Sequence, residues 1–173
     1  MSLGTDWLVG ASITACPSAA TTAATSLTIT GVVRDGAGSP VSDAMIEFWQ
    51  ADPKGRFPPE TPEGWRGFAR VLTDDAGRYT LFTVKPGRVT AGDDTLQAPH
   101  VDVSVFARGL MQRLVTRIYF APDSEALETD PVLASVPEQD RSTLVASPGE
   151  RPGELCFDIW LQGGKETVFF APF

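Results

Sequence analysis

Short apolar runs, each closed by turn residues, recur along the chain from Leu27 onward. In residues 26–30 (SLTIT), Leu27 and Ile29 point to one face and hydroxyl side chains to the other, which is the period-two pattern of a half-buried strand. Glycine-containing turns such as 35–38 (DGAG) and 74–77 (DDAG) separate the runs. This pattern predicts an all-β fold, a β-sandwich of about eight strands. The predicted strands are residues 26–34, 45–50, 67–72, 79–84, 101–107, 114–120, 156–162 and 167–170.

One segment departs from the strand pattern and predicts short helices between residues 124 and 146. Asp130 followed by Pro131 has the form of an N-cap with proline at the first helical position. A second short helix is expected to begin at Pro137-Glu138. We therefore expect helical turns packed on the sandwich.

The length of 173 residues is that of a single domain. We assign residues 27–173 to the β-sandwich and residues 1–26, rich in Ala, Thr and Ser, to an irregular N-terminal arm. Residues 1–4 resemble an expression-vector remnant. Residues 1–30 also lack the basic start and apolar centre of a secretory signal, which predicts a cytoplasmic protein.

The charge balance is acidic, with 14 Lys and Arg against 22 Asp and Glu and a formal net charge of -8. A surface of this sign repels phosphates, and no run of Lys or Arg provides a local basic patch. Nor does any apolar run reach the roughly 18 residues that a membrane-spanning helix needs. The sequence therefore argues against nucleic acid and membranes as partners.

Chemistry-bearing residues are scarce, because the chain has one histidine, two cysteines and two tyrosines. Cys16 and Cys156 form no CxxC-like pattern, and two free, buried thiols are favoured over one long-range disulfide. The glycines form no nucleotide-binding motif. The single histidine, His100, restricts metal binding and acid–base catalysis more than any other feature of the composition.

His100, Asp102 and Ser104 share one face of a predicted strand. Same-face neighbours stand roughly 7 Å apart along a strand, which is too far for a hydrogen-bonded catalytic triad. His100 and Asp102 could supply two metal ligands, but a site needs at least one more donor, and no spacing in the chain indicates it. A histidine hydrogen-bonded at a sheet end is the favoured interpretation. Arg108 precedes a glycine in a predicted turn, where its side chain projects freely and suits a carboxylate partner.

Taken in order, ten segments resemble the intradiol ring-cleavage dioxygenases, and among them the α-type chains of two-chain enzymes. The match runs from about residue 27 to the C-terminus, although residues 1–26 lack the segment with which such α chains usually begin. The matching segments are 31–36 (GVVRDG), 45–52 (MIEFWQAD), 67–70 (GFAR), 83–87 (TVKPG), 98–100 (APH), 105–110 (VFARGL), 116–120 (TRIYF), 130–133 (DPVL), 157–159 (FDI) and 166–170 (ETVFF).

The resemblance implies a β-sandwich and oxygen-dependent cleavage of protocatechuate to 3-carboxy-cis,cis-muconate. In such enzymes a homologous β chain holds Fe(III) with two tyrosines and two histidines. The matching positions here are Phe57, Val89, His100 and Asp102, so at most two donors remain. We therefore expect this chain to bind no metal and to contribute no catalytic residue. Its partners are expected to be the iron-binding β chain, protocatechuate and dioxygen, with Arg108 as the substrate-binding residue.

Two other interpretations stay open at this stage. The chain could be a stand-alone, non-catalytic β-sandwich binding module that has lost the iron site. It could also be an enzyme that uses His100 and Asp102 with another metal. An obligate subunit should expose a large apolar interface when it is alone, whereas a stand-alone module should not.

Overall fold

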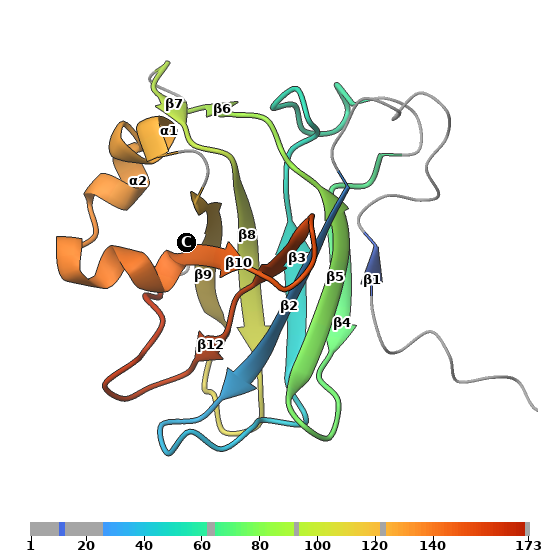
Figure 1. Ribbon diagram of the computed structural model, residues 1–173, viewed down its shortest axis with the longest axis vertical. Coiled ribbons are helices and arrows are strands. Elements are labelled where there is room, and N and C mark those ends of the chain that lie inside the picture. Colours follow the sequence, from blue (N-terminus) through green and yellow to red (C-terminus); the bar gives the residue numbers. More distant parts are fainter. Residues whose placement is uncertain (1–10, 13–25, 62–64, 92–93, 122–123, 172–173) are drawn as a thin grey trace, which may run out of the picture.

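The computed structural model describes residues 11–12, 26–61, 65–91, 94–121 and 124–171, and it is a β-sandwich with short helices along one side (Figure 1). The strands and helices, in chain order, are β1 (Ala11–Ser12), β2 (Ser26–Arg34), β3 (Met45–Trp49), β4 (Phe68–Leu72), β5 (Arg78–Val84), β6 (Val89–Thr90), β7 (Leu96–Gln97), β8 (His100–Phe106), β9 (Leu114–Phe120), α1 (Ser124–Glu128), α2 (Pro131–Ala134), the 3₁₀ helix η3 (Glu138–Leu144), β10 (Val145–Pro148), β11 (Glu154–Cys156) and β12 (Ile159–Trp160).

The strand order is β1-β5-β2-β11-β10-β9-β8-β3-β4, with β12 also paired to β2. Strands β5 and β2 lie in front of β8 and β3 in Figure 1, so the path folds into two layers. Strand β10 joins the layers, because it pairs parallel to β9 and antiparallel to β11. The short hairpin β6–β7 lies outside this path, at one end of the sandwich.

The core lies between the two layers, where inward-facing side chains alternate with outward-facing ones. In β8 the inward residues are Val101, Val103 and Val105, which are at most 1% exposed, while His100 and Asp102 face the other way. Burying each such valine contributes roughly 1.5–3 kcal/mol. Because the alternation is fixed by the core, the outward residues of β8 are fixed too, and these form the site described below.

The predicted β-sandwich with short helices after residue 124 is confirmed, and β2 and β9 have the predicted bounds. Two strand predictions are wrong. Predicted strand 156–162 is divided into β11 and β12, because at the break the Asp158 carboxylate accepts a hydrogen bond from the Val32 N–H at 2.9 Å. Predicted strand 167–170 makes only an isolated bridge, since Phe169 packs on the main core and Phe170 on a second one.

The helical segment has the predicted N-cap. Asp130 caps α2 by accepting a hydrogen bond from the Leu133 N–H at 2.8 Å, and η3 begins just after Pro137. The segment ends earlier than predicted, because Val145 already belongs to strand β10. None of the helices among the described residues is long and apolar enough to cross a membrane. Of the predicted N-terminal arm only Ala11–Ser12 and Ser26 are described, and Ala11–Ser12 pairs with β5.

Candidate functional site

The loop after β3 is shaped by a buried carboxylate, Asp52, which is 1% exposed. Its Oδ1 accepts hydrogen bonds from the Lys54 and Arg56 backbone N–H groups, and its Oδ2 accepts two from the Arg56 guanidinium, at 2.7 and 3.0 Å. Burial raises the pKa of Asp52, but the bonds and charge of Arg56 outweigh burial and lower it overall. The ionised carboxylate therefore holds the turn that leads into Phe57.

Two glycines allow this loop to pack closely against the segment before β6. Gly55 has φ +78°, and a Cβ at this position would lie 1.9 Å from the Arg88 carbonyl oxygen. A Cβ on Gly87 would lie 2.5 Å from the Gly55 nitrogen, and the Gly87 N–H donates to the Asp52 carbonyl at 2.9 Å. Only glycine fits such close approach. The loops carrying Phe57 and Val89, two of the positions equated with iron ligands, are thus held together.

Side chains on the outward faces of β3 and β8 lie next to the loop that carries Phe57. Phe57 stacks on Trp49 with ring centroids 5.7 Å apart and planes 4° from parallel. Trp49 pairs with Asp102 across the sheet, and directly opposed residues in antiparallel strands point to the same side. Asp102 in turn lies opposite Arg117 of β9. The third and fourth ligand positions, His100 and Asp102, therefore lie beside the first.

Arg117 completes the cluster. Its Nε donates to Asp102 Oδ1 at 2.8 Å, and its Nη1 donates to Gln97 Oε1 at 2.9 Å. Gln97 pairs with Val89 in the β6–β7 hairpin. A continuous series of contacts thus runs from Phe57 through Asp102 and Arg117 to the β6–β7 hairpin that carries Val89. Arg117 and Asp102 thus form an ion pair between β9 and β8.

His100 is held in one orientation and one tautomer. Its Nδ1 lies 2.7 Å from the Ala98 carbonyl oxygen, which can only accept, so Nδ1 carries the proton and Nε2 keeps its lone pair. Nε2 lies 3.8 Å from Asp102 Oδ2. Burial, followed by the charge of Arg117, lowers the pKa of His100, so the ring is neutral at pH 7. The favoured interpretation, a buried histidine hydrogen-bonded at a sheet end, agrees with this geometry.

Asp130 fixes the backbone beside His100. Besides capping α2, its carboxylate accepts hydrogen bonds from the Ala98 N–H at 2.7 Å and the Tyr119 hydroxyl at 3.1 Å. Burial raises the pKa of Tyr119, which therefore stays a donor. Sequence reasoning identified Asp130 only as a helix cap. Its second role depends on a tertiary contact between the N-cap of α2 and Ala98, which follows β7, and the sequence carries no signal for that contact.

The residues at these four positions do not fit a ferric ion. Phe57 and Val89 have no donor atom, and the Arg117 cation is bonded to the carboxylate of the fourth position. Ferric iron needs several oxygen or nitrogen donors, and only the His100 nitrogen and the Asp102 carboxylate remain. Across the described ranges no group of three or more His, Cys, Asp or Glu side chains is placed to hold a metal.

Arg108 lies two residues beyond the opposite end of β8, a strand that spans roughly 20 Å from His100 at ~3.3 Å per residue. It is in a turn completed by Gly109 at φ +91°, as expected, and its side chain is 88% exposed. The side chain is not wholly free, because its Nε lies 3.2 Å from Asp43 Oδ2. Arg108 therefore cannot act at the site built around His100 in its own chain, but it is accessible to another molecule. We call that site the His100 cluster; it consists of Trp49, Phe57, Val89, Gln97, His100, Asp102 and Arg117.

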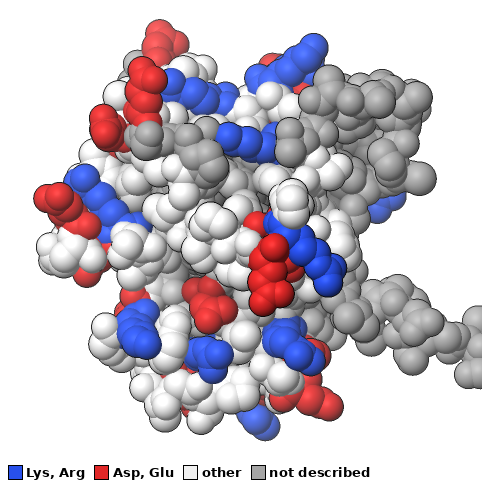
Figure 2. Space-filling model, in the orientation of Figure 1, with Lys and Arg blue, Asp and Glu red and all other residues white. Residues whose placement is uncertain are grey.

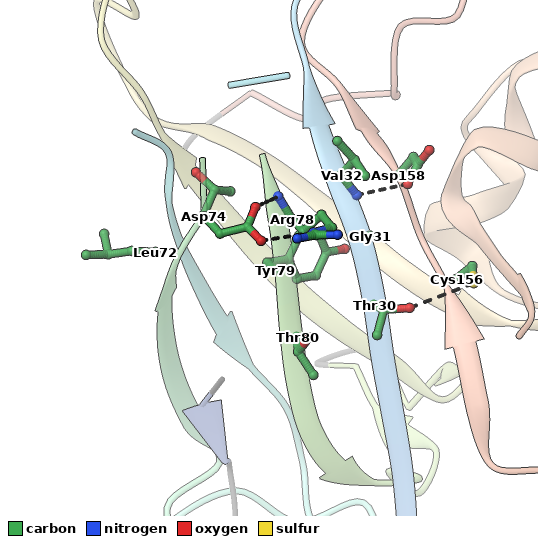
Figure 3. Close-up of a pocket in the computed structure, with 11 residues that line it drawn as sticks. Thr30, Gly31, Val32, Leu72, Asp74, Arg78, Tyr79, Thr80, Cys156 and Asp158 are labelled. Carbon is green, nitrogen blue, oxygen red and sulfur yellow. Dashed lines mark hydrogen bonds and ion pairs between the residues drawn. The ribbon is translucent and has the colours of Figure 1, made fainter. Parts of the chain in front are cut away.

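A separate cavity of about 630 Å³ is lined by residues of β2 and β5, by the end of β4 with the turn after it, and by Cys156 and Asp158 (Figure 3). Two of its carboxylates are already bonded, Asp74 to Arg78 and Asp158 to the Val32 N–H. Cys156 lines it as an exposed free thiol 3.8 Å from Thr30 Oγ1. The expectation of a buried thiol is thus wrong for Cys156, whose side chain points outward from β11; Cys16 lies outside the described residues.

The charged side chains form no large basic area on the face shown in Figure 2. Lys and Arg alternate there with Asp and Glu among the described residues. The layer that carries the His100 cluster exposes apolar side chains instead. Trp49 and Phe68, which pair across β3 and β4, are each 39% exposed, and Leu72 is 46% exposed. The Glu47–Arg70 ion pair lies between Leu72 and the two aromatic side chains, so Leu72 is separate from the Trp49–Phe68 pair. Exposed aromatic side chains on a sheet face are typical of a surface that contacts another protein.

The sandwich and its short helices define an intradiol-dioxygenase-type domain. Residues 12–163 match the family described as dioxygenase. The chain belongs to this family of oxidoreductases.

Named relatives agree with this assignment. The chain is 45% identical over 151 residues to the protocatechuate 3,4-dioxygenase alpha chain of Burkholderia cepacia, which covers 82% of this chain and 75% of the relative. It is 33% identical over 157 residues to the beta chain from the same organism, covering 82% and 66%. The crystal structure of catechol 1,2-dioxygenase from Pseudomonas arvilla C-1 superposes with a TM-score of 0.68 at 22% identity, covering 90% of this chain and 56% of that one. This last likeness concerns the fold alone.

Proposed function

We propose that the chain is the α-type subunit of a protocatechuate 3,4-dioxygenase and works only when paired with a homologous, iron-bearing β chain. The pair uses dioxygen to open the protocatechuate ring between its hydroxyl groups, giving 3-carboxy-cis,cis-muconate. The observation that carries the proposal is the higher identity to an α chain, 45%, than to the β chain of the same organism, 33%. The isolated chain is inactive, and the complex is cytoplasmic.

The His100 cluster supports the division of roles between the two chains. Its loops keep the arrangement that brings four ligand positions together, while two of the four side chains lack any donor. The chain thus keeps the scaffold of the family without a complete donor set. The ferric ion, which supplies the oxidative chemistry of the family, therefore belongs to the partner.

The exposed apolar side chains beside this cluster support association with a partner. Trp49, Phe68 and Leu72 lie on neighbouring strands, and leaving them in water costs free energy that docking would recover. The stand-alone binding module predicts instead a chain that is monodisperse without a partner. The exposed apolar side chains favour the subunit over the stand-alone module.

Arg108 is the substrate-binding residue in this proposal. Its guanidinium is exposed at the end of β8 opposite its own closed cluster, so it can serve only a site completed by another chain. Protocatechuate carries a carboxylate, and a guanidinium binds a planar carboxylate through paired hydrogen bonds. A chain with net charge -8 repels anions overall, so an exposed cation at a defined position favours the binding of an anionic substrate there.

Coexpression tests the proposal. The chain and a homologous β chain, with an affinity tag on the β chain only, should copurify in equal amounts and consume oxygen with protocatechuate. Each chain purified alone should lose most or all of this activity, and the α-type chain all of it. Failure to copurify, together with a well-behaved solitary chain, would support the binding module instead.

A further inference from the structure

Arg117 places a permanent positive charge beside the His100–Asp102 pair. The guanidinium side chain is only 18% exposed, and it binds Asp102 of β8 and Gln97 of β7 at 2.8 and 2.9 Å. An arginine stays charged at every physiological pH. Burial lowers its pKa, but the interactions with Asp102 and Tyr119 together outweigh burial and raise it. The cluster therefore contains a cation although it lacks a metal-binding donor set.

The two remaining donors are arranged as metal ligands are. His100 donates its Nδ1 proton to a backbone carbonyl, which leaves the Nε2 lone pair directed away, and metal-binding histidines are oriented by this kind of bond. Asp102 Oδ2 lies 3.8 Å from that nitrogen, so one ion could contact both atoms. Such a pair in an acidic chain should attract divalent metal ions unless something opposes it.

We propose that Arg117 takes the place of a metal ion, binding the Asp102 carboxylate and repelling metal cations from the His100–Asp102 pair. This role rests on the proposed function, in which the chain holds no iron. Arg117 would keep other metal ions away from the same pair of donors as well. The charge of Arg117 acts on His100 too, because it is the main charged group that lowers the pKa of that ring. The same side chain links the β6–β7 hairpin to the sheet, as coordination bonds would do.

Cobalt(II) titration of purified chains tests this role, because Co²⁺ binds imidazole and carboxylate donors. The untagged wild-type chain and two variants are compared by isothermal titration calorimetry. Arg117→Leu removes the charge and offers no metal donor, whereas Arg117→Lys keeps the charge. We expect Arg117→Leu to bind one Co²⁺ at least tenfold more tightly than either of the others. Adding His100→Ala to Arg117→Leu should abolish the gain.

Circular dichroism shows whether Arg117→Leu has the wild-type fold, and Arg117→Gln replaces it if it does not. Equal Co²⁺ affinity in the wild type and the charge-removing variant would overturn the inference. So would a gain that survives His100→Ala, because the ion would then be bound elsewhere. The proposed function fails separately, through stoichiometric iron in the purified wild-type chain, and that result does not depend on any variant.

Discussion

The two ends of strand β8 differ in how their polar groups are used. At the first end, Asp102 and Arg117 bond to each other, and His100 bonds to a neighbouring carbonyl, all within the chain. At the last end, Arg108 is 88% exposed and has one surface ion pair, with Asp43. A buried polar group must have its partners in the same chain, because leaving it unpaired is costly. An exposed one can exchange water for a ligand.

This difference indicates where the chain contributes to function. The first end is a finished structural unit, and any new ligand there would have to displace an ion pair. The last end can contribute to another molecule at little cost to the fold. The comparison predicts that substitutions at the first end mainly affect stability, while substitutions at the last end mainly affect the substrate.

The largest effect on stability is expected for Asp130→Ala at the closed end. The variant loses the α2 cap and leaves the buried Tyr119 hydroxyl and Ala98 N–H without their acceptor. We expect a loss of about 3–5 kcal/mol in the free energy of unfolding, measured by urea denaturation. Glu138→Ala, at an exposed helical position, is the control and should change it by less than about 0.5 kcal/mol. Equal losses in the two variants would show that the buried hydrogen bonds of Asp130 do not stabilise the His100 end of β8.

Asp52→Asn tests the loop that supports Phe57. At pH 6 we expect a loss of about 2 kcal/mol, because charge-assisted bonds to Arg56 are weakened. The pKa of Asp52 is lowered on folding, so its contribution is complete above the ordinary value of 3.8 and is lost as the pH falls below it. The difference between wild type and variant should therefore shrink progressively in urea titrations as the pH is lowered below 3.8.

Asp74 provides a matched control for that experiment. It accepts the same kinds of bonds, from Ala76 and from the Arg78 backbone and side chain, but in an exposed turn. Asp74→Asn should therefore destabilise the chain less than Asp52→Asn at pH 6. The reverse order would mean that burial of Asp52 does not strengthen its loop.

A double-mutant cycle of Arg117→Leu and Asp102→Asn measures the ion pair itself. Both side chains are partly exposed, so solvent weakens the attraction, and we expect a coupling free energy of about 1 kcal/mol. Urea denaturation of the four proteins at neutral pH gives this value. Purely additive effects would show that the two groups do not stabilise each other.

Arg108→Ala should have the smallest effect on folding, below about 0.5 kcal/mol, because the side chain is almost fully exposed. In the complex with the β chain, it should raise KM for protocatechuate about tenfold while assembly is unchanged, as expected for one lost charge-assisted bond. Arg113→Ala, at an exposed position near the same turn, is the control. An unchanged KM for Arg108→Ala would remove Arg108 from the substrate site.

Local patterns predicted much of the fold. The alternation in β2 and the Asp130-Pro131 cap need only neighbouring residues, and both predictions are confirmed. Residues 167–170 resemble a strand, but their apolar side chains are shared between two cores, which no local pattern reveals.

The candidate site could be predicted only in part. The resemblance located its four positions, but the bond between Asp102 and Arg117 depends on the register of β8 against β9. The connection between these strands, residues 107–113, sets that register, and its apolar and polar pattern does not specify it. The contact of Gly55 with Arg88 is likewise a tertiary feature, although glycine at both 55 and 87 was a signal of close approach.

Iron content tests the central claim most directly. Elemental analysis is applied to the untagged chain purified alone, and to the complex formed with a homologous β chain. We expect far less than one iron per chain in the first sample and about one iron per pair, with the deep colour of ferric phenolate, in the second. Stoichiometric iron in the chain alone would mean that this chain holds its own metal and is not the iron-free subunit.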